Sequence, residues 1–194
     1  MSKIRSICIY CGSRTGVGDE YARLAESVGA SIAAAGLTLV YGGGQVGLMG
    51  IAARAAIDGG GTVIGIIPEH LDTIEIAQTG LSELHVVADM HTRKRMMFDR
   101  SDAFLVLPGG LGSLDEFFEV LTWAQLDLHD KPILLLNHHE FWEPLMDLLR
   151  HVMAQGFAGE SSFDLFTTVP DLDSAFQQLA LSDKPRHAAH PDLL

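Results

Sequence analysis

A glycine-rich turn with a carboxylate behind it is the segment best equipped for chemistry, Pro108-Gly109-Gly110-Leu111-Gly112-Ser113-Leu114-Asp115-Glu116. Glycines let backbone N–H groups approach an anion closely, and the N-terminus of a following helix favours negative charge. Ser113 and Glu116 also have the spacing of a capping box, in which each side chain satisfies a free backbone N–H. A carboxylate here would repel a bound phosphate unless it acts on another part of the same ligand. The turn therefore predicts a phosphate site, with Glu116 either capping the helix or facing the rest of the ligand.

Two further loops follow expected strands, Cys11-Gly12-Ser13 and Gly42-Gly43-Gly44-Gln45-Val46-Gly47. The second loop matches G-x-G-x-x-G, the dinucleotide fingerprint, and Glu69 stands about where an acidic ribose-binding residue would. That fingerprint belongs after the first strand of such a fold, whereas this loop follows the second. Dinucleotide binding and tight packing of a strand against a helix both remain open for it.

The basic run Arg93-Lys94-Arg95 holds three of the 13 Lys and Arg residues of an acidic chain, whose formal net charge is -12. Cations near a helix start oppose the helix dipole, so this run predicts a partner for them, a ligand phosphate or carboxylates. Three consecutive helical residues point in different directions, so at most two can share one site. A solvated face is the simpler alternative. The nine histidines have no metal-ligand spacing, and we expect no metal site.

Length and composition fit one globular domain, expected over 1–181, with a loose polar tail over 182–194. The acidic balance argues against a general binder of nucleic acid or anionic membrane, and no apolar run reaches the length of a membrane span. Cys8 and Cys11 would point to opposite faces of a strand, which argues against a disulfide between them. A reducing cytoplasm is the expected location.

Short apolar runs alternate with segments of helical period. Strands are expected over 7–10, 37–41, 62–67, 84–88, 103–107, 133–136 and, at an edge, 165–169. Helices are expected over 21–35, 48–57, 91–100, 113–128, 141–155 and 174–181, with a less regular segment over 71–82. The strands are apolar throughout, as strands covered on both faces are. This pattern predicts an α/β fold with a doubly wound, Rossmann-like parallel sheet, whose ligands bind beyond the carboxyl ends of the strands.

Taken together, these motifs resemble the cytokinin riboside 5'-monophosphate phosphoribohydrolase (Lonely Guy) family, often mislabelled lysine decarboxylase. Its signature PGGxGTxxE stands here as residues 108–116, with Ser113 in the place of Thr. Five further stretches match, Tyr10-Cys11-Gly12-Ser13, Tyr41-Gly42-Gly43-Gly44 with Gly47-Leu48-Met49-Gly50, Asp89-Met90-His91 with Arg93-Lys94, Thr122-Trp123-Ala124-Gln125-Leu126 and Leu135-Leu136-Asn137. The resemblance spans roughly residues 5–180.

The resemblance implies hydrolysis of the N-glycosidic bond of nucleoside 5'-monophosphates, without a cofactor, by a homodimer. Arg93 and Glu116 match its catalytic pair, with Arg93 holding phosphate or ribose hydroxyls and orienting Glu116. The matching substrate contacts are Glu75, Lys94, Gly109, Gly110, Leu111, Gly112, Ser113, Leu114, Asp115 and Thr122, with Ser13, Gly43 and Gly44 as possible additions. An apolar pocket for a prenylated base would draw on Met90, Phe98, Phe117 or Trp123, which are equally explained as core.

Three other functions are weighed against this one. The Gly42–Gly47 fingerprint would suit an NAD(P)-dependent oxidoreductase. A non-catalytic nucleotide-binding protein would use the same glycine loops, because a fold does not fix its function. An amino-acid decarboxylase is disfavoured, because no lysine has a context that indicates a pyridoxal phosphate site.

Overall fold

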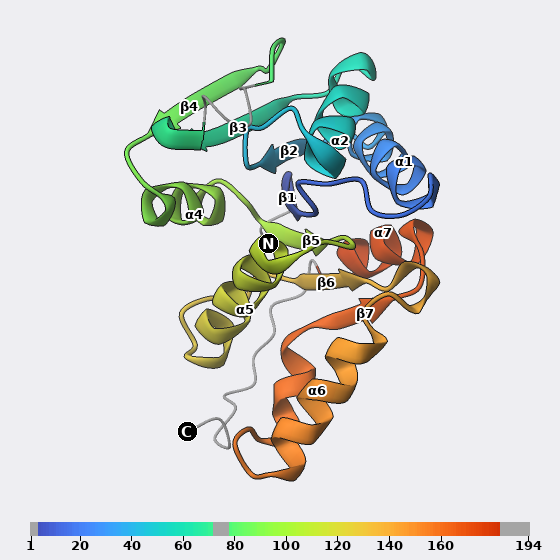
Figure 1. Cartoon of the computed structure of the whole chain (residues 1–194), viewed down its shortest axis with the longest axis vertical. Coiled ribbons are helices and arrows are strands. Elements are labelled where there is room, and N and C mark those ends of the chain that lie inside the picture. Colours follow the sequence, from blue (N-terminus) through green and yellow to red (C-terminus); the bar gives the residue numbers. More distant parts are fainter. Residues whose placement is uncertain (1–3, 72–77, 183–194) are drawn as a thin grey trace.

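One sheet of seven parallel strands runs through the molecule, in the spatial order β4-β3-β2-β1-β5-β6-β7 (Figure 1). The structure is a computed structural model and describes residues 4–71 and 78–182. The strands are β1 (Ser6–Tyr10), β2 (Thr38–Tyr41), β3 (Val63–Pro68), β4 (Glu83–Val87), β5 (Ala103–Val106), β6 (Ile133–Leu136) and β7 (Thr167–Val169). Together with the flanking helices they form a single α/β domain, which confirms the doubly wound parallel fold.

Helices cover both faces of the sheet. The α-helices are α1 (Glu20–Ala34), α2 (Gly47–Asp58), α4 (Met90–Asp99), α5 (Leu111–Gln125), α6 (Glu143–Ala154) and α7 (Leu172–Leu181), and two 3₁₀ turns are η1 (His138–Glu140) and η2 (Glu160–Leu165). Apolar residues of α1, α2 and α7 form the core on one face, and those of α4, α5 and α6 form the core on the other. Double coverage explains why the central strands are apolar at successive positions.

The two cysteines illustrate this two-sided burial. Cys8 belongs to the core under α4 and α5, whereas Cys11 belongs to the core under α1 and α2. Both thiols are free and buried, as their odd spacing along the chain predicts.

The strand order reverses between β1 and β5, which lie side by side although their residues are far apart in sequence. Cys8 pairs with Phe104 and Tyr10 with Val106 in parallel register. Just beyond the strands, the Leu107 N–H donates to the Tyr10 carbonyl (2.9 Å), and the Gly12 N–H donates to the Pro108 carbonyl (3.2 Å). In doubly wound sheets this is the place where ligands bind.

All six helices differ from their expected bounds by one to three residues, and α5 and α6 show why. The helix expected over 113–128 begins at Leu111 and ends at Gln125, because Gly110 already has the extended backbone of an N-cap. The helix expected over 141–155 is slightly shorter, Glu143–Ala154, and the separate 3₁₀ turn η1, in which His139 has a left-handed backbone (φ 50°), lies before it.

Some expectations fall on residues that the structure does not describe. Most of the irregular segment, 72–77, and the tail from 183 onward lie outside the described residues. Among residues 4–71 and 78–182, no helix combines the length and the apolar character needed to cross a membrane.

Candidate active site

The turn between β5 and α5 brings the first amides of a long helix to the sheet's switch point. Gly110 is the N-cap of α5 and carries no side chain to satisfy those amides, which therefore remain available to a ligand. Gly109 is required for a different reason. A Cβ there would lie 2.1 Å from the Ser113 hydroxyl, so any larger residue would push α5 away from the turn.

The capping-box interpretation of Ser113 and Glu116 is wrong. Ser113 is the third residue of α5, not the residue before it, and no side chain caps this helix. The Ser113 hydroxyl is buried and has no hydrogen-bond partner within the described residues. Glu116 lies in the second turn of α5, beyond the reach of the free amides. Helix capping therefore does not explain why Glu116 is buried.

A cavity of about 500 Å³ opens in front of the α5 N-terminus. Its lining joins the β1–α1 loop, the start of α5 and two aromatic rings: Gly12, Ser13, Arg14, Thr15, Gly16, Tyr21, Leu48, Pro108, Gly109, Gly110, Leu111, Gly112 and Phe141. Of the expected substrate contacts, Ser13 and the residues from Gly109 to Gly112 line this cavity. A volume of this size fits a whole small ligand rather than an isolated ion.

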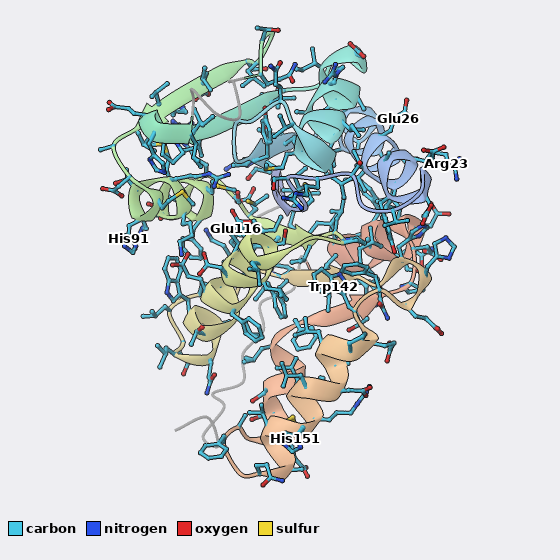
Figure 2. The ribbon with its side chains drawn as sticks, in the orientation of Figure 1. Arg23, Glu26, His91, Glu116, Trp142 and His151 are labelled. Carbon is cyan, nitrogen blue, oxygen red and sulfur yellow. The ribbon has the colours of Figure 1, made fainter. Side chains whose placement is uncertain are left out.

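Arg93 and Glu116, the two residues expected to be catalytic, lie close together, although neither lines this cavity. Arg93 Nη1 lies 4.0 Å from Glu116 Oε1, and the two residues are only 6% and 9% exposed. The guanidinium is held in place by two carbonyls, because Nε donates to Ile66 O and Nη2 to Gly42 O, both at 3.2 Å. Figure 2 shows Glu116 in the interior, on the part of α5 that faces the strands. The arrangement fixes a carboxylate and a cation side by side away from bulk water.

Burial raises the pKa of Glu116 to about 7, and the neighbouring carboxylates of Asp115 and Glu119 add to this rise. The Arg93 and Lys94 cations oppose it but do not cancel it. A carboxyl group with a pKa near neutral exchanges protons readily at physiological pH, as general acids and bases of enzymes do.

The three residues of the basic run, Arg93, Lys94 and Arg95, lie in three different environments. Lys94 Nζ contacts Asp115 Oδ2 at 3.2 Å and Glu119 Oε1 at 2.9 Å, so carboxylates of α5 satisfy this cation. Arg95 points to solvent and pairs with Asp99 one turn along α4. Only Arg93 therefore reaches the buried carboxylate, consistent with the expectation that at most two of the three share a site.

The remaining expected contacts lie outside the cavity. Leu114 packs into the core under α5, while Asp115 and Thr122 are exposed on the helix surface. The Thr122 hydroxyl donates to the Phe118 carbonyl within the same helix. Glu75 lies outside the described residues.

The Gly42–Gly47 loop is explained by packing. A Cβ at Gly42 would lie 1.7 Å from Arg93 Nη2, and one at Gly47 would lie 2.2 Å from the Ser13 carbonyl carbon. Gly43 has a left-handed backbone (φ 80°) against Ile66 and Ile67 of β3, and Gly44 is buried. The glycines thus allow close approach of protein to protein, which removes the main support for a dinucleotide site.

Sequence reasoning missed Arg14, Tyr21 and Phe141 as cavity residues. Arg14 directly follows the Gly12-Ser13 segment at the end of β1, a position that marks it as a site candidate. Tyr21 and Phe141 offer no such signal, because aromatic residues near helix starts are common in cores. Their rings meet edge to face with centroids 5.7 Å apart.

Solved structures share this fold across nearly the whole chain. The molybdenum cofactor binding protein of Rippkaea orientalis has a TM-score of 0.70 at 20% identity, covering 95% of this chain and 99% of that one. The Moco carrier protein of Chlamydomonas reinhardtii has a TM-score of 0.68 at 20% identity, covering 91% and 96% of the two chains. At such identities the likeness concerns the fold alone.

Sequence relatives are much closer. A family described as "Possible lysine decarboxylase" matches residues 49–179. A cytokinin riboside 5'-monophosphate phosphoribohydrolase of Rhodococcoides fascians is 48% identical over 172 residues, covering 88% of this chain and 87% of the relative. One from Arabidopsis thaliana is 41% identical over 178 residues, covering 92% and 83%. With this identity over nearly full length, the chain belongs to the cytokinin riboside 5'-monophosphate phosphoribohydrolase family.

Proposed function

We propose that the chain hydrolyses the N-glycosidic bond of nucleoside 5'-monophosphates, releasing the free base and ribose 5-phosphate. The observation that carries this proposal is the buried Glu116 carboxyl, with a pKa near 7, directly behind a helix N-terminus that is open to an anion. Relatives at 48% and 41% identity bear the name of this activity. The net reaction places the hydroxyl of water on C1′ of the ribose and a proton on the departing base.

The site divides the substrate into two parts. The α5 amides, supported by the Ser113 hydroxyl, take the 5′-phosphate, and the ribose extends towards Glu116. Cleavage of a ribosyl bond builds positive charge on the sugar, and a carboxylate beside it stabilises that charge or activates the attacking water. Arg93 keeps the Glu116 carboxylate in position, and its anchoring to the Gly42 and Ile66 carbonyls supports this role. No cofactor takes part in this scheme.

Adenine nucleotides, including N6-prenylated ones, are the proposed substrates. Of the four apolar candidates for a base pocket, Met90 lies next to the Arg93–Glu116 pair, with its sulfur 3.8 Å from Arg93 Nη1. Phe117 is fully buried core, and Phe98 packs edge to face on Trp123, with ring centroids 4.9 Å apart. Met90 is therefore the residue that we expect to contact the base.

A homodimer is proposed as the working form. Leu111 and Phe118 are 86% and 36% exposed, and they lie seven positions apart on one face of α5. Thr122 continues the same face. A second copy against it would cover exposed apolar surface and bring Thr122 towards a partner, and light scattering after gel filtration tests this assembly. The two free cysteines support a reducing cytoplasmic location.

The decisive experiment is product chromatography after incubation with a panel of substrates. The panel contains AMP, isopentenyladenosine monophosphate, other nucleoside monophosphates and the corresponding nucleosides. We expect free base and ribose 5-phosphate from the monophosphates, and far less base from the nucleosides, which lack the group held by α5. Binding of AMP without release of adenine would instead establish a non-catalytic nucleotide-binding protein. Turnover that requires NAD or NADP would support the oxidoreductase alternative.

A further inference from the structure

The two cations expected to meet the substrate are already engaged by protein groups. Arg93 donates to two backbone carbonyls and faces Glu116, and Lys94 lies between the carboxylates of Asp115 and Glu119. Neither residue lines the described cavity in front of α5. A phosphate bound there needs another positive group, because the whole chain carries a net charge of -12 and repels anions at long range.

Arg14 is the one cationic side chain among the residues that line this cavity. It is exposed, and within the described residues it makes no ion pair and no side-chain hydrogen bond. Its guanidinium is therefore available to a ligand, and a planar fork of N–H donors matches the oxygens of a phosphate.

The backbone around Arg14 is held tightly although its side chain is free. A Cβ at Gly47 would lie 2.5 Å from the Arg14 nitrogen, and one at Gly12 would lie 2.9 Å from the Arg14 carbonyl oxygen. The Gly12 N–H donates to the Pro108 carbonyl, and the Gly12 carbonyl accepts from the Leu48 N–H at 3.0 Å. These contacts place the Arg14 backbone at a set distance from the β5–α5 turn.

An independent feature points to an anion on the opposite side. Ser113, close to the free amides of α5, is only 2% exposed, and its buried hydroxyl has no hydrogen-bond partner within the described residues. It lies against Gly109, which lines the cavity. A buried hydroxyl without a partner costs free energy that a bound phosphate oxygen would recover.

From these observations we infer that Arg14 is a specificity-determining residue, which closes the phosphate site from the β1–α1 loop opposite α5. The inference rests on the proposed function and deepens it: Arg14 makes binding depend on the 5′-phosphate. The ribose end, with Glu116 and Arg93, is unaffected by it. Loss of the guanidinium therefore raises KM for a nucleoside monophosphate, and the change falls on KM rather than on kcat.

The test compares Arg14→Gln with Arg23→Gln, a matched control on the exposed surface of α1 that does not line this cavity. Steady-state kinetics with AMP should give a KM about 10- to 100-fold higher for Arg14→Gln, the effect of one lost charge-assisted contact. Arg14→Lys should restore part of the affinity, and the control should match the unaltered protein. An unchanged KM in Arg14→Gln overturns the inference, and so does a loss confined to kcat.

Calorimetric titration with inorganic phosphate separates this inference from the proposed function. If the unaltered protein binds phosphate and Arg14→Gln binds it at least about tenfold more weakly, Arg14 serves the anion even when no nucleotide is cleaved. Equal phosphate affinities in the two proteins, or no binding by the unaltered protein, overturn the inference. Failure of the unaltered protein to release base from any nucleotide overturns the proposed function instead.

Discussion

The titration of Glu116 predicts a steep dependence of turnover on pH. In the proposed mechanism the carboxylate form acts on the ribose, so activity is present above the pKa of Glu116 and is lost as the pH falls through it. With a pKa of about 7, about 9% of this group is ionised at pH 6 and about 91% at pH 8, so kcat should rise about tenfold between them. A glutamate at its ordinary value of 4.5 would be almost fully ionised at both, and kcat would stay flat.

The assay is initial-rate release of adenine from saturating AMP between pH 5.5 and 8.5. The second ionisation of the AMP phosphate falls near pH 6. Glu119→Gln therefore serves as an internal control. The Glu119 charge raises the pKa of Glu116, so its removal should shift the midpoint of kcat to lower pH while the substrate titrates as before. A kcat that is flat, or falls as the pH rises, would refute the assignment of Glu116 as the acting carboxylate, and so would a midpoint that Glu119→Gln leaves in place.

The raised pKa of Glu116 also makes the stability of the folded protein depend on pH. The folded state binds the Glu116 proton more tightly than the unfolded chain does. This stabilisation is fully present below the unfolded pKa, near 4.5, and is lost as the pH rises through about 7. The loss is at most about 3 to 4 kcal/mol, because the pKa rises from 4.5 to about 7 and one pKa unit corresponds to about 1.4 kcal/mol.

Three substitutions test other parts of the structure. Glu116→Gln should lower kcat about 1,000-fold, while the melting temperature at pH 8 is unchanged or higher because no ionised carboxylate is buried; a much lower melting temperature would indicate a structural role instead. Gly42→Ala should lower kcat about 100-fold, because its Cβ would lie 1.7 Å from Arg93 Nη2 and displace the guanidinium; full activity would show that the position of Arg93 is unimportant. Asp102→Ala removes three hydrogen bonds that Asp102 accepts from Arg5 and Ser6 at the start of β1, and it should cost about 2–3 kcal/mol in urea unfolding, with KM for AMP unchanged; equal stability would show that these bonds do not hold the start of β1 to β5.

Much of the fold follows from local patterns in the chain. Runs such as 133–136 are apolar at every position, and the amphipathic period of α1 ends at a glycine. These signals locate strands and helices to within a few residues because burial on both faces leaves no alternative. The boundary of α5 was missed because Gly110, with no side-chain oxygen, serves as the N-cap, and a sequence pattern favours the hydroxyl of Ser113 for that role.

The proximity of Arg93 and Glu116, the proposed catalytic pair, was predictable only through the resemblance to a family. Arg93 and Glu116 lie on different helices, and no spacing rule relates them. The environment of Lys94 depends on which acidic residues α5 presents to α4, whereas Arg95 pairs with Asp99 of its own helix. Arg14 escaped notice because its role arises from the meeting of the β1–α1 loop with the β5–α5 turn, a contact that only the strand order creates.

The hydrogen bond from Gly12 to Pro108 has a consequence for how activity is acquired. The two walls of the cavity come from segments almost a hundred residues apart, and they join only when β1 has paired with β5. Contacts between such distant segments form late in folding, since the loop between their ends must close first. During refolding, catalytic competence should therefore appear with the slowest phase, after most secondary structure has formed.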